Sequence, residues 1–386
     1  MRIGLVAVTV AAALALLLAT SVGRPVTHGP RKPGASFKYI ANDSHLHLTN
    51  YIQEGPPMSS IVPLMGDKIG RAAIFGIPLQ QEWSYRSSGS AAPTYYLETD
   101  ADLYYYSFTD AYIATQYRSL SKVDQARFDP MITGFNPADM YAADHVRRVL
   151  ETYPGVFVGI GEFSIHKEFV TSKVAGAAPS IGDPALDRLF EFCAEVGLVV
   201  LVHCDADTPF PKAGNDPAYF DDLLAMFRRH PKTTFIWAHI GLGRVIRPFP
   251  DMGKLIEKML DDPTLRHVNV DISWTEVAKY LTATPQTPEL VASIIEKHPD
   301  RFLFGTDEVA PKSQGEYLKV LAMYNPLWDR LPTDVADQVR KRNYERIFDN
   351  ARVKVRAWEA SHRVRSPAPS RTQTLPEPPP TFESTN

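Results

Sequence analysis

Cysteine is scarce in this chain, and this scarcity argues against a small protein held together by disulfide bonds. Only Cys193 and Cys204 occur among 386 residues. Two thiols cannot form a disulfide framework, although a single bridge and two buried free thiols both stay open. Strong charge is absent as well, because the formal net charge is only -3. We therefore expect no nucleic-acid partner and no attraction to anionic membranes. A partner must then be recognised by a specific site, and we expect that partner to be a small-molecule substrate.

A long apolar run occurs at the N-terminus. Arg2 precedes apolar residues that continue to Ala19, and the small polar residues Thr20 and Ser21 follow. This order is typical of a secretory signal with cleavage after Ser21. We expect residues 1–23 to direct export, to the periplasm or out of the cell. An uncleaved N-terminal membrane anchor stays open, since about 17 apolar residues suffice to span a bilayer.

Composition also marks the other boundaries of the chain. Residues 24–36 are rich in glycine and proline and read as a linker. Residues 363–386 form a proline-rich tail that we expect to be disordered. This leaves residues 37–362 as one folded domain, with no internal repeat beyond an alternation of strands and helices.

Within that domain, apolar strands alternate with amphipathic helices. The expected strands cover residues 39–48, 72–77, 130–135, 156–163, 198–203, 233–239, 267–274 and 301–307. Such alternation predicts an α/β fold with a parallel sheet covered by helices. Eight strands fit a (β/α)8 TIM barrel, and a doubly wound sheet is the alternative.

Two parts of the domain lie outside this alternation. Residues 80–126 form an aromatic-rich insertion that either caps a pocket and binds a ring or covers the barrel with a small core of its own. Residues 332–362 are expected to form C-terminal helices.

Polar side chains end several of these apolar strands, which is where TIM barrels carry their chemistry. They are His45 and His47, Glu162, His203, His239 and Asp307. Strand alternation places His45 and His47 on one face and Leu46 and Leu48 on the other. Imidazoles and carboxylates are the usual ligands of zinc and similar ions. The pattern therefore predicts a metal site, although each residue alone could be structural, Glu162 for example in a salt bridge.

These residues also carry a resemblance to a known family. The segments His45-Leu46-His47, Leu201-Val202-His203-Cys204-Asp205, Trp237-Ala238-His239-Ile240-Gly241 and Phe304-Gly305-Thr306-Asp307 resemble the amidohydrolase superfamily. The similarity is to the amidohydrolase-related branch, which also contains single-zinc decarboxylases of aromatic and muconate acids. Residues 341–351 resemble the helix that ends domains of this branch. The resemblance covers about residues 39–352 and implies the same barrel.

The resemblance implies a ligand set for a divalent metal, expected to be zinc, with one or two ions. His45, His47 and Asp307 match the ligands of the first ion. His203 and His239 match ligands of a second ion or, in one-metal members, a ligand and a catalytic acid/base. Glu162 stands where many two-metal members have a carboxylated lysine, and we favour it as a bridging ligand.

The function implied is that of an exported metal-dependent hydrolase. It would use activated water on an amide, ester, lactone or phosphoester, with Asp307 as the base and His239 as a ligand or a contact to the polarised oxygen. Arg244, His166, Lys167 and Trp274 are candidate substrate contacts. One alternative is a single-metal non-oxidative decarboxylase, against which export counts. The other is a catalytically silent binding protein that uses the aromatic insertion.

Overall fold

A computed structural model describes residues 39–50, 53–77, 106–168, 179–212, 214 and 216–362. The chain divides into two units, Met1–Lys38 and Tyr39–Asn386, and every described residue lies in the second. The predicted signal segment, the linker, the proline-rich tail and residues 80–105 of the insertion lie outside the described residues. Among the residues that are described, none of the helices is both long and apolar enough to span a membrane.

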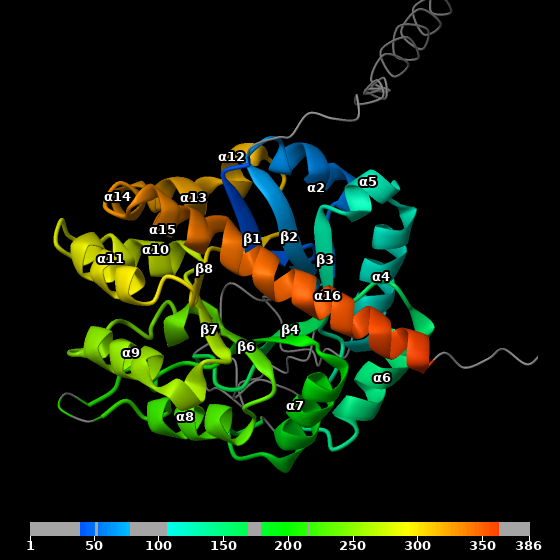
Figure 1. The fold of residues 1–386 in the computed structure, drawn as a ribbon, viewed down its shortest axis with the longest axis horizontal. Helices are drawn as coiled ribbons and strands as arrows, with labels where there is room; N and C mark the ends of the chain where they lie inside the picture. Colours follow the sequence, from blue (N-terminus) through cyan, green and yellow to red (C-terminus); the bar gives the residue numbers. More distant parts are fainter. Residues whose placement is uncertain are drawn as a thin grey trace, which may run out of the picture. The chain divides into compact units, whose positions relative to one another are not determined.

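A parallel sheet forms the centre of the described unit (Figure 1). Its strand order is β8-β7-β6-β5-β4-β3-β2-β1-β9, and each strand runs parallel to its neighbours. The strands are β1 (Ala41–His47), β2 (Ile69–Phe75), β3 (Phe128–Ile132), β4 (Gly159–Ser164), β5 (Val199–His203), β6 (Thr234–Trp237), β7 (Val268–Asp271), β8 (Phe302–Leu303) and β9 (Glu308–Val309).

The sheet closes into a barrel through one short segment, residues 302–309, whose two ends are β8 and β9. The amide of Ile272 donates to the carbonyl of Leu303 at 3.0 Å, which joins this segment to β7. The amide of Ser44 donates to the carbonyl of Phe304 at 3.0 Å, and that of Asp307 to the carbonyl of His45 at 2.8 Å, which joins it to β1. The predicted barrel is confirmed, and the doubly wound alternative is wrong.

The last predicted strand, residues 301–307, is wrong as a continuous strand. Strand β8 ends at Leu303, and Asp307 has a positive φ of 52°, which extended backbone does not have. Gly305 lets the segment approach its neighbours closely. A Cβ atom there would lie 2.9 Å from the Cβ atom of His45 and 3.0 Å from that of Ser273.

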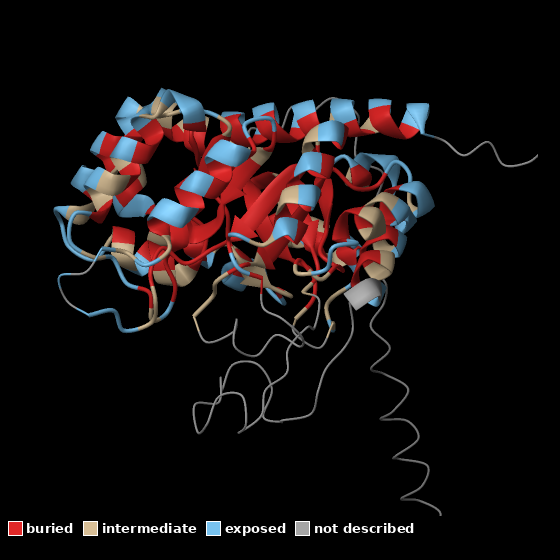
Figure 2. Cartoon of the chain, turned by 90° about the horizontal axis from the view of Figure 1, so that it is seen from below, coloured by how far each residue is buried: buried red, intermediate tan, exposed pale blue. Residues whose placement is uncertain are grey.

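Helices cover the outside of the barrel, and their outer faces are exposed while the strands are buried (Figure 2). Those before β8 are α2 (Met58–Met65), α4 (Tyr106–Ser119), α5 (Lys122–Gln125), α6 (Ala142–Thr152), α7 (Pro184–Val196), α8 (Phe220–Arg229), α9 (Met252–Asp261), α10 (Thr275–Leu281) and α11 (Thr287–Lys297). Those after β9 are α12 (Gln314–Tyr317), α13 (Lys319–Met323), α14 (Asn325–Trp328), α15 (Thr333–Asp337) and α16 (Asn343–Ser361). A single π-helical turn, η4 (Gln338–Arg342), joins α15 to α16.

Local signals explain where α7 begins and ends. The side chain of Asp183 accepts a hydrogen bond from the amide of Ala185, Pro184 occupies the first turn, and Gly197 ends the helix with a φ of 85°. These are the preferred residues at those positions. Cys193 in this helix and Cys204 after β5 are buried free thiols, so the alternative of a bridge is wrong.

Helix α16 packs across one end of the barrel (Figure 1). Its residues Tyr344, Ile347 and Phe348 belong to the same buried cluster as Phe75 and Leu201 of the strands. Asp129 of β3 is fully buried beneath the helix. Its carboxylate accepts hydrogen bonds from the Tyr344 hydroxyl at 2.7 Å, from Arg71 at 2.8 Å and from Arg352 at 2.5 Å. Apolar packing and this ionic group together fix the helix to this end of the barrel, which we call the barrel floor.

The described part of the aromatic-rich insertion forms α4 and α5. The carboxylate of Asp110 in α4 accepts hydrogen bonds from the amides of Thr133 and Gly134, both at 2.9 Å. These amides follow β3, so α4 is attached at the carboxyl end of that strand. How residues 80–105 relate to a pocket stays a prediction.

Candidate metal centre

The two histidines of β1 point into the barrel, as strand alternation predicts. Both rings pack against Phe75 of β2, with ring centroids 5.4 Å away for His45 and 4.7 Å for His47. Leu46 and Leu48 lie on the other side, in the core between strands and helices. The inward face of β1 therefore presents two imidazoles to the barrel interior.

Four side chains, one of them His45, converge from different strands at one point in the barrel interior. Potential ligand atoms of His45, Glu162, His239 and Asp307 all lie within 4.8 Å of one another. The Nε2 atom of His45 lies 3.3 Å from Asp307 and 3.6 Å from Glu162. The Nε2 atom of His239 lies 3.4 Å from Glu162. His47 is next to the group, with its Nε2 atom 3.0 Å from Asp307.

The donor set of this cluster fits a divalent ion. The Nε2 atoms of His45 and His239 are buried and have no hydrogen-bond partner, whereas buried polar atoms in folded proteins are normally paired. Both atoms face two carboxylates, and imidazole nitrogen with carboxylate oxygen is a typical ligand combination for zinc and related ions. A cation at this point would give both nitrogens a partner.

Three residues in or next to the cluster have positive φ angles. His239, Trp274 and Asp307 follow β6, β7 and the interrupted β8, and their φ angles are 59°, 84° and 52°. Residues other than glycine seldom adopt such angles, and those that do gather at functional sites. The predicted strand over residues 233–239 accordingly ends early, at Trp237.

His203 lies beside the four-residue group. Its Nδ1 atom is 2.8 Å from Glu162, and its Nε2 atom is 2.8 Å from Asp205. The Nζ atom of Lys167 lies 3.2 and 3.4 Å from the two oxygens of Glu162. Glu162 therefore has the salt bridge considered for it from the sequence and also faces the cluster. Whether it bridges two ions stays a prediction.

The charges of the cluster shift the pKa values of its members. Burial alone would raise the pKa of Glu162, but the positive charge of Lys167 and a hydrogen bond from His203 hold it well below its usual value. Burial would likewise raise the pKa of Asp307, but His45 and His239 hold it below the usual range. Both carboxylates are therefore ionised at neutral pH.

The two central histidines shift in opposite directions. Burial disfavours the charged imidazole of His45, but Asp307 and Asp271 outweigh burial and raise its pKa well above the ordinary value. For His239 burial prevails, and its pKa is lowered. The cluster thus stabilises one positive charge among its carboxylates, which is also what a metal ligand set requires.

Asp271 and Ser273, which the sequence analysis missed, hold the far sides of both central imidazoles. The Nδ1 atom of His45 lies 3.0 Å from Asp271, and the Nδ1 atom of His239 lies 2.9 Å from the hydroxyl of Ser273. Asp271 ends the apolar strand β7, so the criterion that selected Glu162 and His203 would also have selected it.

Asp43 attaches β1 to the closing segment. Its carboxylate accepts from the amide and hydroxyl of Thr306 at 2.8 and 2.7 Å and from the Tyr317 hydroxyl at 3.0 Å. These bonds set His45 and His47 against Asp307. The sequence analysis did not foresee this role of Asp43.

The candidate substrate residues occupy two places near the cluster. The ring centroid of Trp274 lies 5.1 Å from that of His239, and the guanidinium of Arg244 lies 5.0 Å from the Trp274 ring. His166 stacks on Tyr219 with centroids 4.0 Å apart, and its carbonyl accepts from the amide of Asp205. Arg244 and Trp274 are thus close to His239, whereas His166 lies on the side of His203. Their contact with a substrate stays a prediction.

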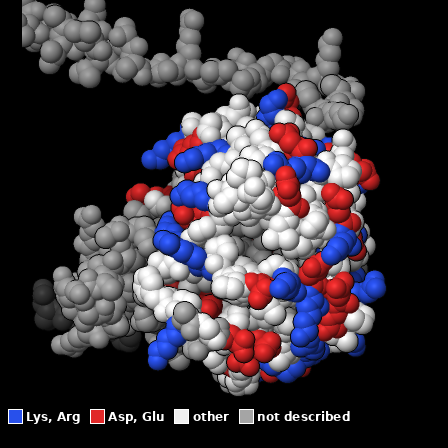
Figure 3. Space-filling view, turned by 90° about the vertical axis from the view of Figure 1, so that its left-hand side faces the viewer, with Lys and Arg blue, Asp and Glu red and all other residues white. Residues whose placement is uncertain are grey.

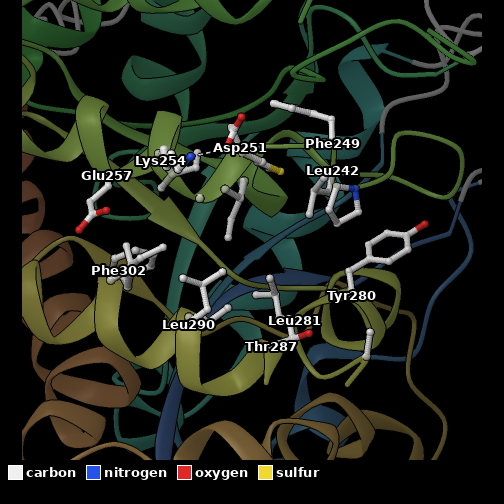
Figure 4. Close-up of a pocket in the computed structure, with 18 residues that line it drawn as sticks. Leu242, Phe249, Asp251, Lys254, Glu257, Tyr280, Leu281, Thr287, Leu290 and Phe302 are labelled. Carbon is white, nitrogen blue, oxygen red and sulfur yellow. Dashed lines mark hydrogen bonds and ion pairs between the residues drawn. The ribbon is translucent and has the colours of Figure 1, made fainter. Parts of the chain in front are cut away.

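A separate apolar cleft lies between α9, α10 and α11 (Figure 4). It has a volume of about 530 Å³, and Leu242, Phe249, Leu281 and Leu290 are among its lining residues. On this side of the molecule, charged side chains surround an uncharged centre (Figure 3). The cleft approaches the cluster at Ile240, the neighbour of His239, but His45, Glu162, His239 and Asp307 are not among its lining residues. The chemistry described above therefore belongs to the barrel interior.

Comparison with known proteins agrees with the barrel. A family model described as amidohydrolase matches residues 42–349. An uncharacterised TIM-barrel protein from Bordetella bronchiseptica superposes with a TM-score of 0.50 at 15% identity, covering 81% of this chain and 99% of that chain. At this identity the likeness shows the fold alone.

Two further solved structures are similar. A putative 2-pyrone-4,6-dicarboxylic acid hydrolase from Pseudomonas putida has a TM-score of 0.48 and 13% identity, with 81% of this chain and 98% of that chain covered. A 2,6-dihydroxybenzoate decarboxylase complexed with 2,6-dihydroxybenzoate has a TM-score of 0.49 and 14% identity, with 80% and 99% covered. No curated protein sequence matches this chain.

Proposed function

The chain belongs to the amidohydrolase family, and from this premise we propose that it is a metal-dependent hydrolase of amide, ester, lactone or phosphoester bonds. One observation carries the proposal. The buried Nε2 atoms of His45 and His239 have no hydrogen-bond partner and face the carboxylates of Glu162 and Asp307. Such a set suits a cation and a polar reaction at the barrel mouth.

We propose that one ion, zinc or a similar divalent metal, is held by His45, Glu162, His239 and Asp307, with His47 adjacent. A bound ion of this kind lowers the pKa of water towards about 7 and polarises a carbonyl or phosphoryl oxygen. The proposal of one ion is supported by His203, because both of its ring nitrogens lie 2.8 Å from carboxylates. A second ion bridged by Glu162 is the alternative.

Asp307 is the proposed general base. Its side chain is 10% exposed, and its lowered pKa keeps it ionised at neutral pH. It would accept a proton from the attacking water and return it to the leaving group. Trp274 and Arg244, next to His239, would bind a planar or anionic part of the substrate through an aromatic face and a cation.

A decarboxylase is the second candidate, favoured by the cations near the cluster. Lys167 lies beside Glu162, and Arg244 lies over Trp274. Two cations near one site could receive a substrate with two anionic groups. Hydrolase and decarboxylase differ in their products, so they can be separated directly.

The deciding experiment measures metal content and turnover on the same purified full-length chain. We expect one equivalent of metal and hydrolysis of at least one chromogenic ester, lactone, anilide or phosphoester. Asp307→Asn should abolish turnover, whereas Asp349→Asn on the surface of α16 should not. Release of carbon dioxide from a dihydroxybenzoic acid without any hydrolysis would establish the decarboxylase. Bound metal with neither activity would favour a binding protein.

We also propose that residues 1–23 export the chain, on the basis of the Arg2-led apolar run alone. Fractionation of cells expressing the full chain with a C-terminal tag tests this. Recovery of the protein outside the cytoplasm supports export, and recovery of the intact chain in the cytoplasm refutes it.

A further inference from the structure

The hydroxyl of Ser273 lies among three polar groups of the buried site. Its Oγ atom is 2.6 Å from Asp271 Oδ1, 2.9 Å from His239 Nδ1 and 3.2 Å from His45 Nδ1. Ser273, Asp271, His45 and His239 are all fully buried. A hydroxyl has one hydrogen to donate, so these contacts cannot all be donations from Ser273.

The contacts of Asp271 show where that hydrogen goes. Its Oδ1 atom accepts from the amides of His239 and Ser273 at 2.9 and 3.1 Å, and its Oδ2 atom faces the His45 Nδ1 atom at 3.0 Å. With N–H donors on both oxygens, Asp271 acts as an ionised acceptor. Two oxygens 2.6 Å apart need a hydrogen between them, and only the Ser273 hydroxyl can supply it.

The direction of the hydrogen bond between Ser273 and His239 follows by elimination. Because the Ser273 hydrogen points to Asp271, the Oγ atom presents only lone pairs to His239. Its 2.9 Å contact with His239 Nδ1 is a hydrogen bond only if that nitrogen carries the hydrogen. A neutral imidazole with hydrogen on Nδ1 has its lone pair on Nε2, and Nε2 of His239 is the buried atom without a hydrogen-bond partner.

We propose that Ser273, held by Asp271, is a positioning residue that fixes His239 in the tautomer with its Nε2 lone pair directed at Glu162 and Asp307. The role of this tautomer in metal binding rests on the proposed metal-dependent function. Ser273 is not one of the four residues of the cluster. It acts through His239, whose Nε2 atom it keeps available for an ion or a proton.

The test measures the tautomer directly in the metal-free full-length protein. Histidine labelled with 15N gives long-range 1H–15N spectra in which a protonated ring nitrogen differs from an unprotonated one. His239→Gln identifies the signal by its loss. We expect wild-type His239 to carry its hydrogen on Nδ1. We expect Ser273→Ala to move this hydrogen to Nε2 or to produce exchange between the two nitrogens.

Ser44→Ala is a matched control, since Ser44 is equally buried and its Oγ atom has no hydrogen-bond partner. It should leave the His239 spectrum unchanged. In a separate titration, Ser273→Ala should weaken zinc binding about 10- to 100-fold, as removal of a group that orients a ligand does, and Ser44→Ala should not.

The wild-type spectrum alone can overturn the inference, by showing the hydrogen on Nε2, even if Ser273→Ala does not fold. An unchanged His239 tautomer in a folded Ser273→Ala variant would also overturn it. Because the spectra need no metal and no substrate, an absence of hydrolysis would refute the proposed function and leave the tautomer result standing.

Discussion

The ring of His45 contacts both the other potential metal ligands and the residues that hold the imidazoles in place. One nitrogen is bonded to Asp271, and the other faces Asp307 and Glu162. We expect His45→Ala to abolish stoichiometric zinc binding and turnover while the circular dichroism spectrum stays native, because strand packing rests on Leu46 and Leu48. His230→Ala removes another buried imidazole, which pairs with Asp187 outside the centre. That control should retain its zinc, and zinc retained in both variants would contradict the assignment of His45.

The protonation of His45 predicts how metal affinity depends on pH. Burial opposes its charge, but Asp307 and Asp271 raise its pKa well above the ordinary 6.5. A protonated Nε2 atom cannot bind metal, so below the raised pKa an ion must displace one proton. Affinity should therefore rise with pH, by up to about tenfold per unit, and fall as the solution becomes more acidic.

Competition with a chromophoric chelator at pH 6, 7 and 8 measures this slope. An affinity that is constant across this range in the wild-type chain would mean that the carboxylates do not keep His45 charged.

At the residue scale, the sequence predicted the side chains that meet but not the groups that hold them in place. His45, His47, Glu162, His203, His239 and Asp307 each lie at or near the end of an apolar strand, and this shared position singled them out together with the resemblance to the family. Ser273 has no such signal, since a serine after a strand is common. Its partners come together only because β7 lies between β6 and the closing segment.

The floor of the barrel gives a prediction at the scale of elements. Asp129 is fully buried and paired with Arg71, Arg352 and the Tyr344 hydroxyl. Asp129→Ala would leave the half-buried guanidinium groups of Arg71 and Arg352 and the buried Tyr344 hydroxyl without their partner, and should lower the free energy of unfolding by about 3 kcal/mol. Asp349→Ala removes a carboxylate that is 60% exposed and pairs with the same Arg71. That change should cost less than about 1 kcal/mol.

Urea denaturation of both variants compares the two losses. Equal losses would show that burial of Asp129 adds nothing to the attachment of α16. Metal content, measured on the same samples, should be unchanged in both, because Asp129 lies near the start of β3 and the candidate centre lies at the opposite ends of the strands.

Elements were predicted best where a single physical signal was strong. The α7 helix has its cap, its proline and its terminal glycine in the preferred order, and these residues are enough to place both of its ends. The α2 helix was missed because Pro56 and Pro57 indicate a loop, although α2 begins directly after them at Met58. The ends of β6 and β8 were placed too late because the positive φ angles at His239 and Asp307 have no signature in these residue types.

For the whole molecule, metal should stabilise the fold. An ion that binds only the folded barrel raises its free energy of unfolding by about 2.7 kcal/mol at a free concentration about 100 times the dissociation constant. We expect a chelator to lower the melting temperature and zinc to restore it. Asp307→Asn should melt at the same temperature with and without zinc. If zinc raised its melting temperature as much as that of wild type, the stabilising ion would be bound elsewhere.

The closing segment has a consequence for synthesis of the protein. His47 and Asp307 are 260 positions apart in the chain, and Asp43 and Thr306 are 263 apart. A nascent chain on the ribosome therefore lacks one side of the centre until nearly the whole barrel has been translated. The proposed ion can therefore bind only late in synthesis, after ring closure, and a chain that stops before Phe302 should have no competent centre at all. A factor that supplied the proposed ion would have to act after residues 302–309 have joined β1.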